Sequence, residues 1–180
     1  MTDTTSFQIP QIDDWHLHLR DGALLNDVAH YSAKWCHRAI VMPNLQPPVT
    51  KAADALVYKA RIKEAVGDAD FTPLMVIYLT DNTTEDTIKE AKQAGVVAAK
   101  YYPAGATTNS ENGVTDFKKM LPIFKTMEAE NMVLLLHGEV VDADIDIFDR
   151  EAVFIERYMP WLLEHCPDLR IVLEHITTKR

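Results

Sequence analysis

Short apolar runs alternate with longer amphipathic stretches along the whole chain. Several of the apolar runs contain β-branched residues, which is typical of strands that are buried on both faces. The longer stretches carry apolar residues at helical spacing. The predicted strands are Trp15–Leu19, Ala39–Pro43, Thr72–Thr80, Val96–Tyr102, Val133–His137 and Arg170–Ile176. The predicted helices between them are Leu24–Trp35, Ala52–Val66, Glu85–Ala94, Asp116–Glu130 and Phe148–His165.

Residues that favour helix ends lie near the predicted boundaries. Thr50 precedes the second helix, and Thr83 or Thr84 precedes the third. A threonine side chain in that position accepts a hydrogen bond from one of the first helical amides. Gly95 follows the third helix, where a left-handed residue is favoured. These signals support the predicted alternation of strands and helices.

Strands that alternate with helices predict a parallel sheet with right-handed crossovers. Such a sheet is either open and doubly wound or part of a (β/α)₈ barrel. No glycine-rich phosphate loop follows the first strand, as a dinucleotide-binding sheet would require. Polar residues follow most of the strands, and in a barrel these strand ends share one face. We therefore predict an α/β fold of the TIM-barrel type.

The predicted barrel is incomplete. A barrel of this type usually has eight strands and about 250 residues, whereas the 180-residue chain supplies only about the first six strands. We expect residues 1–180 to form a single domain that is the N-terminal part of a longer barrel protein.

Composition limits the classes of partner. The net charge is −9 and the lysines and arginines are scattered, which argues against a nucleic-acid or anionic membrane surface. No apolar run reaches the roughly 20 residues that span a bilayer. The segment Met1–Pro10 lacks the order of a signal peptide, and Cys36 and Cys166 are weak candidates for a disulfide. We expect a cytoplasmic protein.

Four histidines and one lysine lie at the C-terminal ends of four predicted strands. His16 and His18 are two positions apart, so on a strand their side chains project from the same face. Two imidazoles on one face can chelate a metal ion. In a closed barrel, Lys100, His137 and His175 would converge at the same mouth. The sequence therefore predicts a metal site formed by His16, His18, Lys100, His137 and His175.

Lys100 ends an apolar run, which places its amine near the core. Two interpretations are open. Lys100 is either a structural lysine, snorkelling to solvent or paired with an acid, or a functional lysine with a lowered pKa. A neutral amine can react with carbon dioxide to give a carbamate, and the carbamate oxygens can bridge two metal ions.

Arg20 and Asn44 follow the first two predicted strands. A guanidinium binds a carboxylate through a planar fork, and an amide adds a donor, so together they indicate a small acidic substrate. The structural alternatives are a salt bridge from Arg20 to Asp14 or Asp21, and a turn role for Asn44. The small, polar segment Pro103–Gly113 is either a lid or an ordinary connection.

The remaining histidines are not assigned to the site. His30, His37 and His165 lie on or beside predicted helices. There an imidazole caps the helix dipole or lies in solvent.

These motifs resemble the dihydroorotases of the amidohydrolase superfamily, in particular the shorter bacterial type. The similarity follows the whole chain in order and covers about the first half of such an enzyme. The matching segments are Asp13-Asp-Trp-His-Leu-His-Leu-Arg-Asp21, Val41-Met-Pro-Asn44, Lys100-Tyr-Tyr-Pro103, Leu136-His-Gly-Glu139, Asp144-Ile-Asp-Ile-Phe-Asp-Arg-Glu151 and Leu173-Glu-His-Ile-Thr-Thr-Lys179.

The resemblance implies a binuclear zinc centre. His16 and His18 would bind the more buried Zn²⁺, and His137 and His175 the more exposed one. Carboxylated Lys100 would bridge the two ions.

It also implies a substrate site. Arg20 and Asn44 would bind the substrate carboxylate, and Thr107 and Thr108 would hydrogen-bond the substrate from a mobile lid. The implied reaction is the reversible cyclisation of N-carbamoyl-L-aspartate to dihydroorotate, a step of pyrimidine biosynthesis. We expect a homodimer that binds N-carbamoyl-L-aspartate or dihydroorotate and binds neither nucleic acid nor membranes.

The family's catalytic aspartate lies on the eighth strand, beyond Arg180, so we expect no catalytic residue within this span and no turnover by these 180 residues alone. Two alternatives to a dihydroorotase are open. One is a related metallohydrolase of cyclic amides, such as a hydantoinase. The other is a non-catalytic, dihydroorotase-like scaffold.

Overall fold

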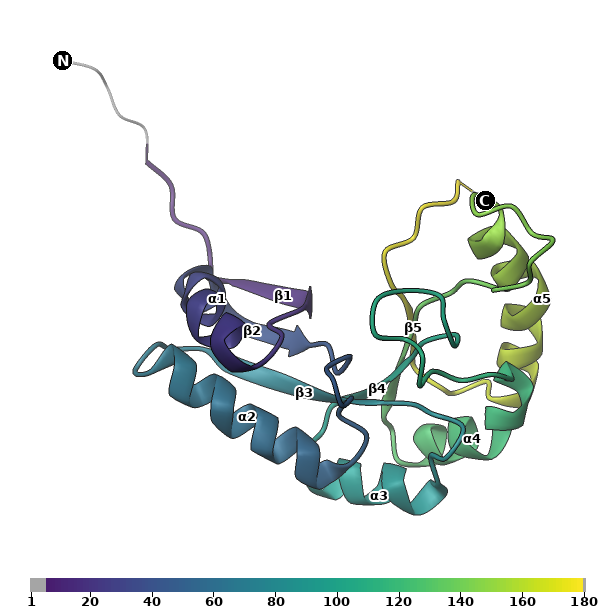
Figure 1. The fold of residues 1–180 in the computed structure, drawn as a ribbon, viewed down its shortest axis with the longest axis horizontal. Coiled ribbons are helices and arrows are strands. Elements are labelled where there is room, and N and C mark those ends of the chain that lie inside the picture. The colour runs from purple at the N-terminus through teal and green to yellow at the C-terminus, as the bar shows by residue number, and fades with distance from the viewer. Residues whose placement is uncertain (1–5, 180) are drawn as a thin grey trace.

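Six parallel strands form one sheet in the order of the chain. The computed structural model describes residues 6–179, and its strand order is β1-β2-β3-β4-β5-β6. A doubly wound sheet would reverse its strand order at a switch point, whereas this sheet runs in one direction and curls into an arc (Figure 1). The predicted incomplete (β/α)₈ barrel is confirmed. Residues 1–5 and 180 of the predicted single domain lie outside the described residues.

The helices cover the outer side of the arc, where α2, α3, α4 and α5 follow one another (Figure 1). The strands are β1 (Ile12–Leu17), β2 (Cys36–Val41), β3 (Thr72–Tyr78), β4 (Ala98–Tyr101), β5 (Val133–Leu136) and β6 (Ile171–Leu173). The helices are α1 (Gly22–Trp35), α2 (Ala52–Val66), α3 (Glu85–Gln93), the 3₁₀ helix η1 (Phe117–Met120), α4 (Leu121–Ala129) and α5 (Arg150–His165). None of the helices in the described part of the chain is long and apolar enough to cross a membrane.

The main core lies between the sheet and its helices, and a smaller apolar cluster lines the concave side. Ala99 and Tyr101 of β4 belong to the main core, whereas Ala98 belongs to the concave cluster with Val76 and Leu135. Because side chains alternate along a strand, Lys100 shares the concave face with Ala98. The register of β4 therefore turns Lys100 toward the interior of the arc.

Several predicted boundaries are shifted by one to three residues. β2 is Cys36–Val41 rather than Ala39–Pro43, and β6 is Ile171–Leu173 rather than Arg170–Ile176. The first strand is Ile12–Leu17 rather than Trp15–Leu19. The helix predicted over Asp116–Glu130 is divided, because Pro122 lacks an amide hydrogen and lies in the first turn of α4. The last helix begins at Arg150, since Phe148 still belongs to a turn in which its amide donates to Asp146 (2.9 Å).

The capping predictions are confirmed for two residues and wrong for one. The Thr84 hydroxyl accepts a hydrogen bond from the Thr87 amide (3.2 Å), and Gly95 is left-handed with φ of 81°. Thr50 does not cap α2, because the helix begins one residue later and Lys51 occupies the N-cap position without a side-chain hydrogen bond.

Candidate active site

One cavity gathers residues that follow the carboxyl ends of separate strands. Its volume is about 210 Å³. Eight of the nine site residues predicted from the sequence line it, and Tyr102 is an additional wall residue. The lining residues are His16, His18, Arg20, Asn44, Tyr102, Thr107, Thr108, His137 and His175. The ninth predicted residue, Lys100, is fully buried and lies off the cavity wall.

The four imidazoles form a contiguous group. The Nε2 atoms of His16 and His18 are 3.1 Å apart. The ring centroids of His16 and His175 are 5.3 Å apart, and those of His137 and His175 are 4.7 Å apart. Two nitrogen ligands on one tetrahedral zinc ion lie about 3.3 Å from each other. The His16–His18 separation therefore suits a shared cation.

Glu174 connects Lys100 to this group and was missed by the sequence analysis. One carboxylate oxygen pairs with the Lys100 amine, and the other lies 3.0 Å from Nδ1 of His16. Ligand atoms of His16, Glu174 and His175 all lie within 4.8 Å of one another. An acidic residue at the end of the apolar run Ile171–Leu173 was the available signal, because a buried carboxylate needs a partner.

Lys100 shows a feature of each of its two interpretations, an acidic partner and a lowered pKa. Burial lowers the pKa of Lys100 and outweighs the opposing effect of the Glu174 carboxylate. Burial alone would raise the pKa of Glu174, but the hydrogen bond from His16 and the charge of Lys100 lower it overall. Lys100 is thus paired with an acid, as a structural lysine would be, and its pKa is lowered, as a functional lysine requires.

Burial favours neutral imidazoles around the cavity. Desolvation, together with the charges of His16 and Arg20, lowers the pKa of His18 to about 4. Desolvation is also the largest cause of the lowered pKa values of His137 and His175. Metal ligation requires the unprotonated ring.

These observations fit a bound metal ion. Metals such as Zn²⁺ take neutral imidazole nitrogens together with carboxylate oxygens. The cavity presents four imidazole rings, and Nδ1 of His18 is a buried atom without a hydrogen bond in the part of the chain that the structure describes. His137 Nε2 lies 2.9 Å from a carboxylate oxygen of Glu139, which can orient the ring.

Arg20 enters the cavity from a left-handed backbone position. Its φ is 59°, and the Tyr58 hydroxyl fixes this turn by donating to the Arg20 carbonyl (2.6 Å). One terminal nitrogen of Arg20 is buried and makes no hydrogen bond to any described residue. The salt bridge considered for Arg20 does not form: Asp21 instead pairs with Arg61 (2.7 Å), which leaves the guanidinium available to a ligand.

Asn44 presents an acceptor to the cavity rather than the predicted donor. Its Nδ2 already donates to the carbonyl of Thr108 (3.0 Å). Its Oδ1 is buried and lies near the His18 ring, where it opposes the lowering of the His18 pKa. An amide oxygen in this position suits an N–H group of a ligand better than a carboxylate.

The segment Pro103–Gly113 is a folded loop that contributes Thr107 and Thr108 to the cavity wall. It is joined at its base by hydrogen bonds between Ala104 and Val114 (3.0 Å) and between Val114 and Tyr102 (2.9 Å). Asn109 ties its tip to the loop after β2, because its Nδ2 donates to the Asn44 carbonyl (3.0 Å). These contacts suit both interpretations of the segment, a lid and an ordinary connection.

Strained backbone is concentrated at the site. The described non-glycine residues with positive φ are Arg20, Asn109, Asn131 and His175. Three of them, Arg20, Asn109 and His175, belong to the cavity or to the Pro103–Gly113 loop beside it. Such conformations cost free energy and are characteristic of functional sites.

The histidines outside the predicted site lie as expected. His30 is exposed beside Tyr31. Nδ1 of His37 is 3.5 Å from a carboxylate oxygen of Asp70, and Nδ1 of His165 is 2.8 Å from the Trp161 carbonyl at the end of α5.

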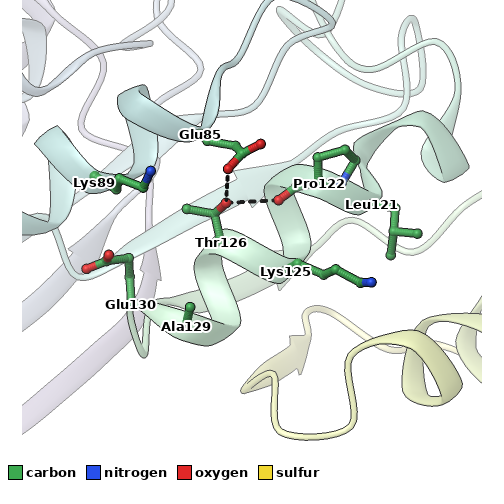
Figure 2. A pocket seen from close by; sticks show the side chains of 8 residues that line it. All are labelled: Glu85, Lys89, Leu121, Pro122, Lys125, Thr126, Ala129 and Glu130. Carbon is green, nitrogen blue, oxygen red and sulfur yellow. Dashed lines mark hydrogen bonds between the residues drawn. The ribbon is translucent and has the colours of Figure 1, made fainter.

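A second hollow lies on the outer side of the sheet, between α3 and α4 (Figure 2). Its volume is about 460 Å³. The Thr126 hydroxyl at its centre hydrogen-bonds within the protein, to Pro122 (3.0 Å) and to Glu85 (3.3 Å). This groove lacks the unpartnered buried groups of the imidazole cavity and does not indicate a ligand.

Comparisons with known proteins agree with this geometry. A dihydroorotase of Marinobacter nauticus is 58% identical over 97% of this chain, which spans 51% of that relative. The crystal structure of a dihydroorotase from Campylobacter jejuni has a TM-score of 0.85 and 43% identity over 93% of this chain and 48% of its own. The crystal structure of the Saccharomyces cerevisiae dihydroorotase in complex with 5-fluoroorotic acid has a TM-score of 0.83 and 39% identity, and the match covers 92% of this chain and 48% of that chain. The chain thus spans about half the length of these relatives. The family model for amidohydrolases matches residues 9–179, and the chain therefore belongs to the amidohydrolase family.

Proposed function

We propose that this chain carries the metal-binding half of a dihydroorotase, which cyclises N-carbamoyl-L-aspartate to dihydroorotate and reopens the ring in pyrimidine biosynthesis. The observation that carries the proposal is that eight residues, predicted from the sequence and from its resemblance to dihydroorotases, line one cavity. The names of the relatives with 55–58% identity favour this activity over the hydantoinase-like alternative.

The proposed cofactor is a pair of zinc ions. His16 and His18 would hold one ion, His137 and His175 the other, and carboxylated Lys100 would bridge them. When bound, the ions would lower the pKa of water and polarise the amide carbonyl of the substrate. Carboxylation of Lys100 requires its amine to leave Glu174 and lose a proton, and the lowered pKa of Lys100 favours that loss.

The protein's own groups would bind and shield the substrate. Arg20 would pair with the carboxylate through its unpartnered guanidinium nitrogen. The Asn44 carbonyl oxygen would accept a hydrogen bond from a ring N–H. Thr107 and Thr108 lie on the lid, where closure excludes water from the cavity.

Turnover is proposed to require residues outside this chain, among them an aspartate. The retained ligands argue against the scaffold alternative for the whole protein. A homodimeric, cytoplasmic enzyme is part of the proposal.

Zinc analysis of the purified chain tests the metal centre. We expect close to two zinc ions per chain, and a loss of at least one in His137→Asn. His30→Asn is the matched control, because His30 is exposed and lies outside the cavity. A wild-type chain with clearly less than one zinc ion would contradict the binuclear centre.

Binding of dihydroorotate by the zinc-loaded chain tests the substrate. Calorimetric titration should show binding that Arg20→Ala weakens at least tenfold, because the carboxylate loses a charge-assisted hydrogen bond. Equal affinity in the variant would remove the carboxylate role of Arg20.

A further inference from the structure

Tyr102 lines the cavity but was not assigned a role from the sequence. Its hydroxyl group is unusual in its surroundings. Its side chain is 2% exposed, and the hydroxyl is a buried atom without a hydrogen-bond partner among the described residues. A buried hydroxyl without a partner costs folding free energy. Such a group is retained at a site where a ligand supplies the missing partner.

The ring of Tyr102 is held in place from two directions. It stacks on Tyr78, with ring centroids 5.0 Å apart. The Tyr78 hydroxyl is itself engaged, since it donates to the Asn109 carbonyl of the lid (3.3 Å). The Tyr102 carbonyl accepts from the Val114 amide where the lid closes on itself (2.9 Å). The hydroxyl therefore has a fixed position in the cavity wall.

This position is on the side of the candidate metal ligands. The ring centroid of Tyr102 is 6.0 Å from that of His137, and the Lys100 amine lies 4.9 Å from the Tyr102 centroid. Tyr102 follows Lys100 by two residues, so both project from the concave face of β4 and its extension. In the proposed function, the reacting amide of the substrate occupies this side of the cavity.

The phenol is a hydrogen-bond donor under all ordinary conditions. A phenol hydroxyl is protonated at neutral pH. It can therefore donate a hydrogen bond to a carbonyl oxygen.

Resting on the proposed function, we propose that Tyr102 is a further substrate-binding residue, whose hydroxyl donates a hydrogen bond to a carbonyl oxygen of the cyclic amide. This hydrogen bond would orient the reacting group against the imidazoles. The ligand class is a cyclic amide or imide that also carries a carboxylate.

The test compares Tyr102→Phe with Tyr101→Phe in the zinc-loaded chain. Tyr101 is a matched control, because it is also a buried phenol on the same segment, but it packs on the outer face against Phe117 and Phe154. The probe is 5-fluoroorotate, which carries both a carboxylate and a ring imide. Its affinity is measured by calorimetry and by fluorine NMR.

Tyr102→Phe should weaken 5-fluoroorotate binding about 5- to 50-fold, whereas Tyr101→Phe should change it less than about twofold. The melting temperature of the ligand-free Tyr102→Phe chain should be unchanged or higher, because an unsatisfied buried hydroxyl is removed. A purely structural tyrosine would give the opposite pattern, with a lower melting temperature and unchanged affinity, and that result would overturn the proposal.

A second probe separates the two ends of the ligand. Succinate has carboxylates but no amide, so its weaker binding should not respond to Tyr102→Phe. An equal loss for succinate would place the hydroxyl at the carboxylate and overturn the assignment. If the wild-type chain binds neither 5-fluoroorotate nor dihydroorotate, the proposed function fails and this inference fails with it. If the wild type binds and both variants bind equally, only the role of Tyr102 is lost.

Discussion

Glu174 forms an ion pair with Lys100 in the interior of the sheet, although the two residues are 74 positions apart in the chain. Their side chains are 4% and 0% exposed. Lys100 projects from the concave face of β4, and Glu174 follows β6. The pair therefore exists only when the curl of the sheet brings the ends of these strands toward each other.

Replacing Glu174 with Gln should destabilise the metal-free chain by about 3 kcal/mol, because an uncompensated ammonium would remain buried. The loss should be smaller at about pH 9 than at about pH 6, since the lowered pKa of Lys100 lets the amine shed its proton as the pH rises. Urea denaturation at the two pH values measures both effects.

Asp142→Asn is the control for that substitution. It breaks the exposed ion pair of Asp142 with Arg157 (3.0 Å), and such pairs contribute less than about 1 kcal/mol. A Glu174→Gln chain as stable as Asp142→Asn would show that the buried pair is not needed for folding.

Glu151 should make stability fall in acid. Its carboxylate accepts hydrogen bonds from the amides of Thr177 (2.9 Å) and Thr178 (2.7 Å). Burial opposes ionisation, but these hydrogen bonds prevail and lower the pKa of Glu151 from its ordinary value of 4.5. A lowered folded-state pKa means that the contribution is complete above the unfolded value and is lost as the pH falls through the folded one.

Denaturation curves of the wild type and Glu151→Gln at several pH values check this contribution. The difference in unfolding free energy should be largest near neutral pH and should shrink below about pH 4.5. A constant difference across the acid range would contradict the assignment.

Asn109→Gly should loosen the lid without straining it. Glycine accepts the positive φ of 56° at this position, but it removes the side-chain hydrogen bonds to the Asn44 carbonyl (3.0 Å) and from Gln46 (2.8 Å). Amide hydrogen exchange in the lid should become about tenfold faster, which corresponds to about 1.4 kcal/mol of local stability. Asn112→Gly, at an exposed position of the same loop, should leave the exchange rates nearly unchanged.

Gly113→Ala should be more damaging than Gly105→Ala. A methyl group on Gly113 would lie 2.5 Å from the Tyr102 carbonyl oxygen and 2.9 Å from that of Ser110, both of them backbone atoms. Gly105 has open space around it but a φ of 78°, so alanine there costs about 1 kcal/mol. We expect Gly113→Ala to cost at least about 2 kcal/mol by thermal denaturation. The reverse order would show that the lid base can shift.

The fold was largely predictable because each local pattern agreed with the global architecture. Apolar runs identified all six strands, and the polar residues after them favoured a barrel over an open sheet. Two of the boundary errors occurred where a local interaction set the start of a helix. Pro122 fixed the start of α4, and the turn at Asp146 delayed α5 until Arg150.

The part of the site that could be predicted consists of residues whose type alone suggests a chemical role. Histidines at strand ends are unusual enough to be noticed one by one. Tyr102 and Glu174 were not noticed, because a tyrosine in a strand and a single glutamate after a strand are ordinary in sequence. Their roles depend on burial and on missing or distant partners.

The sequence by itself determined which residues lie at the carboxyl ends of the strands, since hydrophobic periodicity and residue type are local properties. Only the tertiary structure decided which of these residues face one another. The curl of the sheet joined Lys100 to Glu174, the Pro103–Gly113 loop took up the amide donor of Asn44, and the stacking of Tyr78 fixed the Tyr102 hydroxyl. Those relationships depend on distances between segments far apart in the chain, which no local pattern encodes.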